Sequence, residues 1–230
     1  MIDTSFDVRS DAGGRDPDKS SPTLRRYHQL LWSKPLPGGT LFDLDTSTQS
    51  SYLHHRSDLG EFWLSSDSVI PTFSGWRDVE PILRQLDPGE LEAFTHAGYT
   101  VGGMMVFPGH RVDGKMTING ARGFLRRIAD RMDLTLECIR RHYLDQPSPL
   151  GVTLDRYGDF FALFEDFRGY CDFFLLQDLL RDDLSVDPFL PYDDFELSAL
   201  PGDLGAYRRY RDASVRFVEA RNTRVSRLHR

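Results

Sequence analysis

The sequence predicts an α+β fold, in which a small mixed and partly antiparallel sheet from the N-terminal half packs against a mainly helical C-terminal half. Short apolar runs in the first half are separated by Gly, Pro, Asp and Ser, which is typical of strands and turns. The second half carries apolar residues at helical spacing. No internal repeat or linker divides the chain, so we expect one domain over residues 1–230, with an extended N-terminal arm (1–20) and a frayed basic tail (225–230).

Turn signals and apolar runs place the elements of the first half. We predict a helix that Ser21 caps and that stops near Lys34, since Pro22 suits the first helical position. The other predicted elements are a strand over Thr40–Leu44, a hairpin from Ser51–Ser57 and Glu61–Ser66, two short helices over Asp78–Leu86 and Pro88–Ala97, and a strand over Val101–Phe107. The last strand is apolar apart from its glycines, which indicates a central position covered on both faces.

Helical periodicity dominates the second half. One apolar face runs from Ile118 to Ile139 and predicts a single long helix. Gly120 and Gly123 lie in its first turns, where they allow either tight helix packing or access for a ligand. The remaining predicted elements are a Phe-rich helical pair over Gly151–Phe164 and Phe167–Leu180, an edge strand over Leu184–Leu190, and a last helix over Gly202–Arg224.

Composition excludes several classes of protein. The 230 residues are 40% hydrophobic and 27% charged, typical of a folded chain with a substantial core. A net charge of −7 argues against broad, non-specific nucleic-acid binding, although it does not exclude a local basic patch. Cys138 and Cys171 have no metal-ligand spacing and are interpreted as buried thiols. The N-terminal residues lack the apolar core of a signal peptide and no apolar run approaches membrane-spanning length, so we expect a cytoplasmic protein without a membrane partner.

The polar loop between the strand Val101–Phe107 and the helix that follows is the first candidate site. It offers Arg111, Asp113, Lys115, Asn119 and Arg122 where a strand gives way to a helix, a place where anions bind to helix N–H groups and nearby cations. Arg111, Lys115 and Arg122 are therefore candidate anion-binding residues, with Asn119 as a polar positioning group. The alternative is a solvated, salt-bridged loop with Asn119 as a helix cap.

The predicted hairpin carries the second candidate site. On a strand, His54 and Arg56 share one face, while His55 points to the other and so forms no metal pair with His54. His54 is the candidate proton carrier, with Arg56 as an anion holder, and a structural histidine is the alternative. The cluster Ser65–Ser68 follows the aromatic strand, and Ser66 is a candidate catalytic or positioning hydroxyl, although such residues also form ordinary turns.

Arginines form the third candidate feature. If residues 118–139 were one helix, Arg122 and Arg126 would lie one turn apart on one face, and Arg126 would extend the anion-binding strip. The interspersed Asp130, Asp133 and Glu137 favour a salt-bridged, solvated face as the alternative. No P-loop, Rossmann, zinc-protease or nucleophile-elbow motif is present, and the sequence assigns no cofactor or metal.

Five stretches carry a resemblance to a known family. The chain over Ser21–Gly39, Tyr52–Ser68, Lys115–Gly123, Asp133–Tyr143 and Arg156–Leu179 resembles a bacterial family of hypothetical proteins known only as a domain of unknown function. The resemblance implies one intact cytosolic domain of about this length and carries no activity to transfer.

These observations lead to a functional expectation. We expect an enzyme, such as a transferase, that binds an anionic substrate, nucleotide- or tRNA-linked, between the sheet and the helices. One alternative is a non-catalytic binding or interaction protein of stress or phage defence. Another is an NAD-using enzyme, because the order of a His-bearing strand, a Ser-rich strand end and a basic loop is similar to that in ADP-ribosyltransferase folds.

Overall fold

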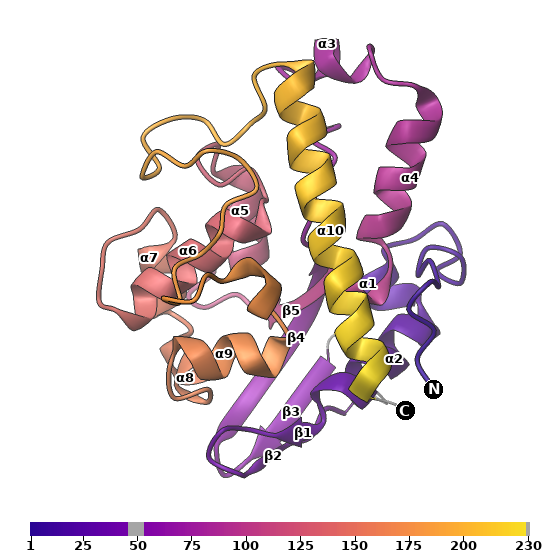
Figure 1. Cartoon of the computed structure of the whole chain (residues 1–230). Coiled ribbons are helices and arrows are strands. Elements are labelled where there is room, and N and C mark those ends of the chain that lie inside the picture. Colours follow the sequence, from indigo (N-terminus) through magenta and orange to yellow (C-terminus); the bar gives the residue numbers. More distant parts are fainter. Residues whose placement is uncertain (46–52, 229–230) are drawn as a thin grey trace.

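The computed structural model describes residues 1–45 and 53–228 and confirms an α+β architecture (Figure 1). The helices of this part of the chain are α1 (Pro17–Ser20), α2 (Pro22–Trp32), α3 (Glu80–Leu83), α4 (Pro88–Gly98), α5 (Ile118–Phe124), α6 (Met132–Tyr143), α7 (Gly151–Asp155), α8 (Gly158–Ala162), α9 (Phe167–Phe174) and α10 (Leu204–Leu228), with the 3₁₀ turns η1 (Val101–Gly103) and η2 (Gln177–Leu179). The strands are β1 (Lys34–Pro35), β2 (Leu41–Phe42), β3 (Leu53–Ser57), β4 (Gly60–Ser68) and β5 (Met104–Pro108).

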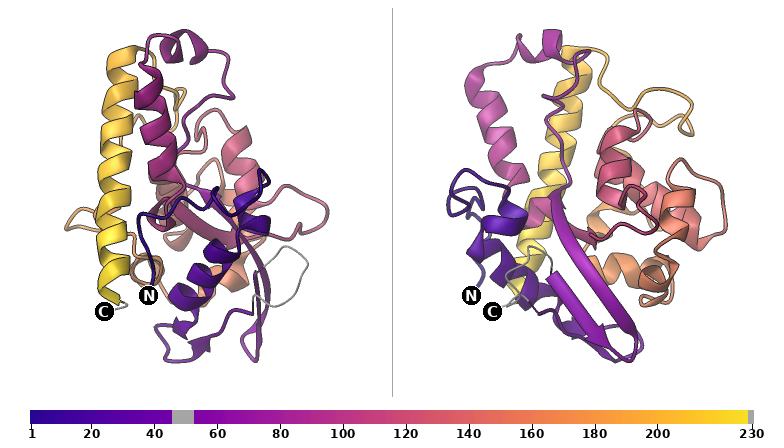
Figure 2. Two further views of the ribbon diagram at one scale, coloured as in Figure 1. Left: turned by 90° about the vertical axis from the view of Figure 1, so that its right-hand side faces the viewer. Right: turned by 180° about the vertical axis from the view of Figure 1, so that it is seen from behind.

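The sheet is small and antiparallel. Strands β3, β4 and β5 pair in that order, and β1 pairs with β2 in a separate two-stranded ribbon. The predicted hairpin is confirmed, since β3 and β4 pair with Arg56 opposite Glu61. The central position predicted for β5 is wrong: it ends the three-stranded order, although all five of its residues are buried. Figures 1 and 2 show this sheet between α5–α9 on one side and α1, α2, α4 and α10 on the other.

Local capping signals set the helix starts where the sequence predicted them. Ser21 accepts a hydrogen bond from the Leu24 N–H at 3.0 Å and begins α2. Asp87 accepts one from the Gly89 N–H at 2.9 Å and begins α4. A side-chain oxygen at the N-cap satisfies an N–H that has no partner within the helix, which is why these boundaries can be read from sequence.

The N-terminal arm packs onto the domain largely as a series of turns. It ends in the single-turn helix α1. Val8 is fully buried and its N–H donates to the Tyr99 carbonyl at 3.0 Å, beyond the end of α4. Residues far apart in the sequence thus fix the arm, which explains why local pattern did not reveal its course.

The long helix predicted from Ile118 to Ile139 is wrong, because the chain turns between α5 and α6. Ala129 and Asp130 in the connection have φ of 47° and 65°, in the left-handed region. The Asp130 N–H donates to the Arg122 carbonyl at 2.9 Å and folds the connection back on α5. The predicted helices over residues 151–164 and 167–180 are also broken, into α7, α8, α9 and η2.

Helix α10 is longer than predicted and packs along α4 and η1 (Figures 1 and 2). It continues through Leu228, and Val225 is only 1% exposed, so residues 225–228 belong to this helix. Residues 229–230 lie outside the described part. The predicted strand Leu184–Leu190 is also wrong, since in the described chain it forms one isolated bridge, between Val186 and Leu180.

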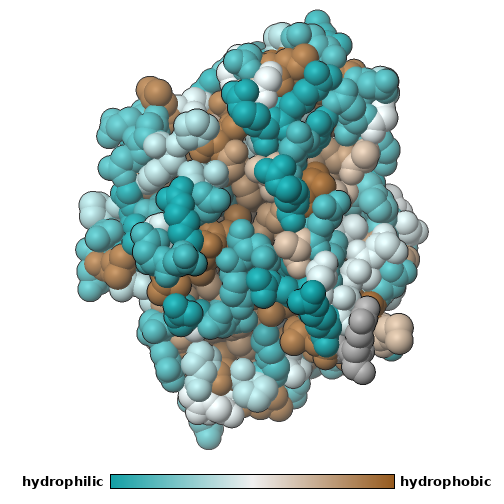
Figure 3. Space-filling view, in the orientation of Figure 1, coloured by the Kyte–Doolittle hydropathy of each residue, from teal (hydrophilic) through white to brown (hydrophobic). Residues whose placement is uncertain are grey.

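The core is rich in aromatic side chains, as the sequence indicated. Phe160, Phe161 and Phe164 of the α8 region are each at most 1% exposed and pack with one another. In the orientation of Figure 1 the surface is largely hydrophilic, including along α10, with scattered hydrophobic areas (Figure 3). Within residues 1–45 and 53–228, no helix combines the length and the apolar character needed to span a bilayer.

Candidate functional site

One face of the hairpin carries two of the predicted site residues, His54 and Arg56. Opposite residues of antiparallel strands share a face, so His54 and Arg56 lie beside Trp63 and Glu61. The His54 ring stacks on Trp63 with 3.9 Å between ring centroids, and its Nε2 lies 2.9 Å from a Glu61 carboxylate oxygen. Further along this face, Asn119 Nδ2 donates to the Ser65 hydroxyl at 3.4 Å. His54 is therefore held in place by its neighbours, and Arg56 is exposed.

Ser66 lies on the opposite, buried face of β4. Its N–H and its hydroxyl both donate to one carboxylate oxygen of Asp18, at 2.7 and 2.8 Å. Asp18 is 4% exposed, and burial raises the pKa of its carboxyl to about 6. Ser66 thus joins α1 to the sheet, and the structure does not bring it together with His54.

The predicted anion-binding loop is mostly solvent-facing. Arg111, Asp113 and Lys115 are exposed, and the loop turns at Asp113 and Gly114, whose φ values are 51° and 70°. None of the described contacts joins this loop to Arg56, the anion holder predicted on the hairpin. Arg56 pairs at the turn end of the hairpin, whereas Arg122 meets Asp67 near the other end of β4. The six residue steps from Glu61 to Asp67 span roughly 20 Å of strand.

The Arg122 side chain is fully buried, so it does not face a ligand from the loop as the sequence predicted. Its Nη1 lies 2.9 Å from Asp130 Oδ1 and 3.5 Å from Asp67 Oδ2. Its Nε donates to the Thr135 hydroxyl at 3.2 Å. The turn between α5 and α6 brings Asp130 to this guanidinium, which therefore joins a strand end to two helices.

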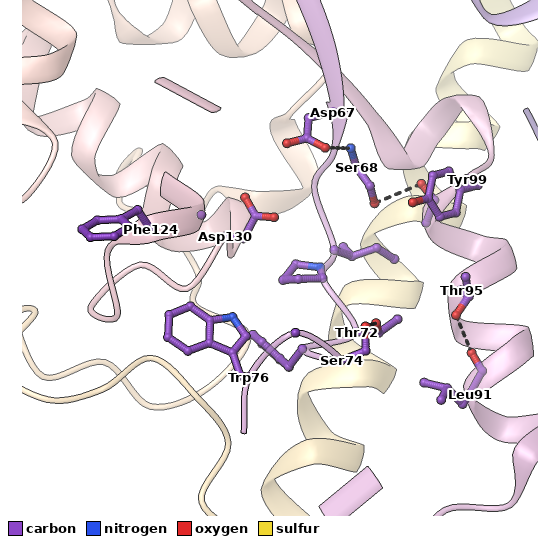
Figure 4. Close-up of a pocket in the computed structure, with 16 residues that line it drawn as sticks. Asp67, Ser68, Thr72, Ser74, Trp76, Leu91, Thr95, Tyr99, Phe124 and Asp130 are labelled. Carbon is purple, nitrogen blue, oxygen red and sulfur yellow. Dashed lines mark hydrogen bonds between the residues drawn. The ribbon is translucent and has the colours of Figure 1, made fainter. Parts of the chain in front are cut away.

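The two carboxylates held by Arg122 lie in the lining of a pocket of about 770 Å³ (Figure 4). This volume is within the range of about 300–1,000 Å³ that is typical of small-molecule sites. The end of β4, the segment that follows it, the end of α5 and one side of α4 form its walls. Polar groups come from Ser68, Thr72 and Thr95, and aromatic surfaces from Trp76 and Phe124.

Asp67 is the group in this pocket best suited to carry a proton. Its side chain is 43% exposed, toward the pocket, and its Oδ1 accepts a hydrogen bond from the Ser68 N–H at 2.9 Å. Desolvation by the surrounding protein raises the pKa of this carboxyl to about 7. The charge of Arg122 opposes this effect, and the charge of Asp130 adds to it. A carboxyl of this pKa can both give and accept a proton near neutral pH.

Tyr99 and Arg126 complete the surroundings. Burial, and then the negative charge of Asp67, raise the pKa of the Tyr99 phenol, so the hydroxyl stays protonated as a hydrogen-bond donor. Arg126 is 53% exposed, pairs with Asp78, and lies over the Trp76 ring at 5.9 Å. Trp76 lines the pocket, so Arg126, a predicted anion holder, contacts one of the lining residues but is not itself among them.

Sequence reasoning missed most of this pocket. Asp67 belonged to the serine cluster singled out in the sequence. Its pKa is raised mainly by desolvation and further by the charge of Asp130, which approaches because the chain turns at Ala129. Trp76 lies in a segment without helical or alternating period, and an isolated aromatic after Ser74 and Gly75 was the only available signal. Gly123 does line the pocket, in keeping with the ligand-access interpretation of that glycine.

Comparison with known proteins gives a family but no activity. No curated protein and no solved structure matches the chain. A family profile described as "Family of unknown function (DUF6994)" matches residues 2–225, nearly the whole chain. The protein therefore belongs to this family of unknown function, DUF6994.

Proposed function

We propose that the protein is an enzyme whose active site is the Asp67 pocket and whose substrate carries a nucleoside, as in the nucleotide- or tRNA-linked substrates expected from the sequence. The observation that carries this proposal is a carboxyl with a pKa of about 7, facing a pocket of about 770 Å³ beside a second carboxylate and a buried arginine. Perturbed acids in clefts are candidates for acid–base catalysis.

The lining suits a ring that bears hydroxyl groups. Trp76 and Phe124 offer faces for a base or a sugar, and Ser68, Thr72 and Thr95 offer hydroxyls for hydrogen bonding. Two carboxylates in the lining disfavour placing a phosphate deep in the pocket, whereas Arg126, which lies over the lining residue Trp76, can receive it. The substrate is therefore oriented with its ring inside and its charge outside.

In this arrangement the Asp67 carboxyl removes or supplies the proton at the reacting atom. Arg122 holds this carboxyl beside that of Asp130. Because Asp67 is half protonated near pH 7, activity that needs its base form rises through that pH, and activity that needs its acid form falls. Roles for His54, Arg56, Ser66 and Asn119 in catalysis or binding stay predictions, as does tRNA binding by the exposed Arg111 and Lys115.

A ligand screen by thermal shift tests this proposal. Nucleosides, nucleotides, NAD and aminoacyl-tRNA are compared at pH 6 and pH 8, since a ligand at 100 times its Kd stabilises the folded state by about 2.7 kcal/mol. The Asp67→Asn variant should lose or change the shift, while Asp113→Asn, in the exposed loop, should keep it. A nucleoside ligand whose shift is equal in both variants would rule out the pocket. Binding without turnover of any bound compound would favour the non-catalytic alternative.

A further inference from the structure

A second cavity, separate from the Asp67 pocket, contains a recessed lysine. Lys34 lies in β1, directly after α2, and its Nζ donates to the Phe173 carbonyl oxygen at 2.5 Å. Nζ also lies 4.6 Å from the centroid of the Phe173 ring and 5.2 Å from that of Trp32. The amine thus lies beside two aromatic rings, and Lys34 lines a cavity of about 440 Å³.

Burial and a neighbouring positive charge favour the neutral form of this amine. Burial is the main cause that lowers the pKa of Lys34 to about 8, and the buried Arg221 lowers it further. Asp172 acts in the opposite direction, and Asp166 and Arg168 also line the cavity. Among residues 1–45 and 53–228, no side chain makes a salt bridge with Lys34. A sizeable fraction of this amine is therefore unprotonated at neutral pH.

The hydrogen bond to Phe173 matters for reactivity. A neutral amine that donates one N–H to a fixed carbonyl keeps its lone pair free to attack an electrophile. Lysine is also scarce in this chain, since only Lys19, Lys34 and Lys115 occur among 28 basic residues. A guanidinium could not take part in this chemistry, because arginine stays protonated.

We propose that Lys34 is a nucleophilic amine that forms an imine with a small neutral aldehyde or ketone bound in this cavity. The Lys34 nitrogen attacks the carbonyl carbon and gives one of its two protons to the carbonyl oxygen, which forms a carbinolamine. The second nitrogen proton leaves with this hydroxyl group as water, the carbon–oxygen bond breaks, and a carbon–nitrogen double bond remains. Pro35, Pro37 and the Phe173 ring provide apolar walls for the substituents of the carbonyl compound. The carboxylates of Asp166 and Asp172 disfavour a negatively charged carbonyl compound.

Reductive alkylation tests the proposal directly. The full chain is treated with butanal and cyanoborohydride at pH 7, and alkylation of each lysine is followed over time by peptide mass mapping. Lys34 should react about ten-fold faster than the exposed Lys115 or more, since a lower pKa leaves more neutral amine. The rate at Lys34 should rise with pH and level off above about pH 8. Equal or slower alkylation of Lys34 would overturn the proposal.

Two controls distinguish a binding site for carbonyl compounds from an amine that is reactive without such a site. Glyoxylate, a small aldehyde with a carboxylate, should show a smaller preference for Lys34 over Lys115 than butanal shows; a larger preference would overturn the neutral ligand class. The Lys34→Arg variant should keep the cation near Phe173, fold with a similar melting temperature, and leave the alkylation of Lys115 unchanged. If butanal protects the parent against thermal unfolding no better than it protects this variant, the cavity does not bind carbonyl compounds.

Discussion

Replacing Asp18 by asparagine should stabilise the protein at neutral pH and leave it almost unchanged at pH 4. The Asp18 carboxyl is 4% exposed, and burial raises its pKa from 3.8 to about 6. Its contribution to stability is therefore complete below pH 3.8 and is lost as the pH rises through about 6. One pKa unit corresponds to about 1.4 kcal/mol, so the ionised carboxylate costs up to about 3 kcal/mol at pH 7. Asparagine removes this cost and still accepts both hydrogen bonds from Ser66 through its amide oxygen.

Urea unfolding of both proteins at several pH values between 4 and 7.5 measures the effect. The difference in unfolding free energy should grow with pH, mostly between pH 4 and 6.5, and level off above that. Ser66→Ala is a matched perturbation at the same contact, because it removes a donor that favours the ionised carboxylate. It should destabilise more at pH 7 than at pH 4. A difference between Asp18→Asn and the parent that is constant from pH 4 to 7.5 would refute the assignment of a raised pKa.

Three further predictions concern residues near the pocket and the packing of β5. Gly120→Ala and Gly123→Ala should each stabilise α5 by up to about 1 kcal/mol in urea unfolding, but only the Gly123 variant, whose Cβ would line the pocket, should weaken binding of a nucleoside found by thermal shift. Equal binding by both variants would contradict the site. Arg122→Met should lower the unfolding free energy by about 3–5 kcal/mol, because two carboxylates lose their shared cation, and an unchanged melting temperature would show that Arg122 is not a structural ion-pair partner. Gly103→Ala should cost about 2–3 kcal/mol, since a Cβ there would lie 2.4 Å from the Gly98 carbonyl oxygen; full stability in thermal unfolding would mean that the backbone can move apart.

Elements defined by neighbouring residues were predicted well. The β3–β4 hairpin depends on two apolar runs around a short turn, and α2 and α4 depend on the capping residues Ser21 and Asp87. The Phe-rich core was also predicted, because the hydrophobic effect acts on composition and spacing whatever the final arrangement. Periodicity failed where the chain turns within an apolar pattern, as at Ala129 and Asp130, since left-handed residues interrupt a helix without changing its apolar spacing.

The candidate site was the least predictable part. The sequence identified a polar strand-to-helix loop and an adjacent run of arginines, of which Arg126 lies over Trp76, a residue that lines a pocket. Arg122 was expected to face a ligand, but it is buried between two carboxylates. Whether an arginine reaches solvent depends on what packs around it, and that is fixed by contacts between segments far apart in the chain.

The sequence by itself determined the α+β class, the hairpin, the capped helix starts and the aromatic core, because each follows from local propensity or from periodic burial. Only the tertiary structure decided which polar groups act together. It brought the carboxylates of Asp130 and Asp67 to the guanidinium of Arg122 and gave Asp67 a pKa of about 7. It also placed the amine of Lys34 beside Phe173. The physical reason is that the ionisation of a side chain depends on its solvation and on the charges within a few ångströms, which residues distant in sequence supply.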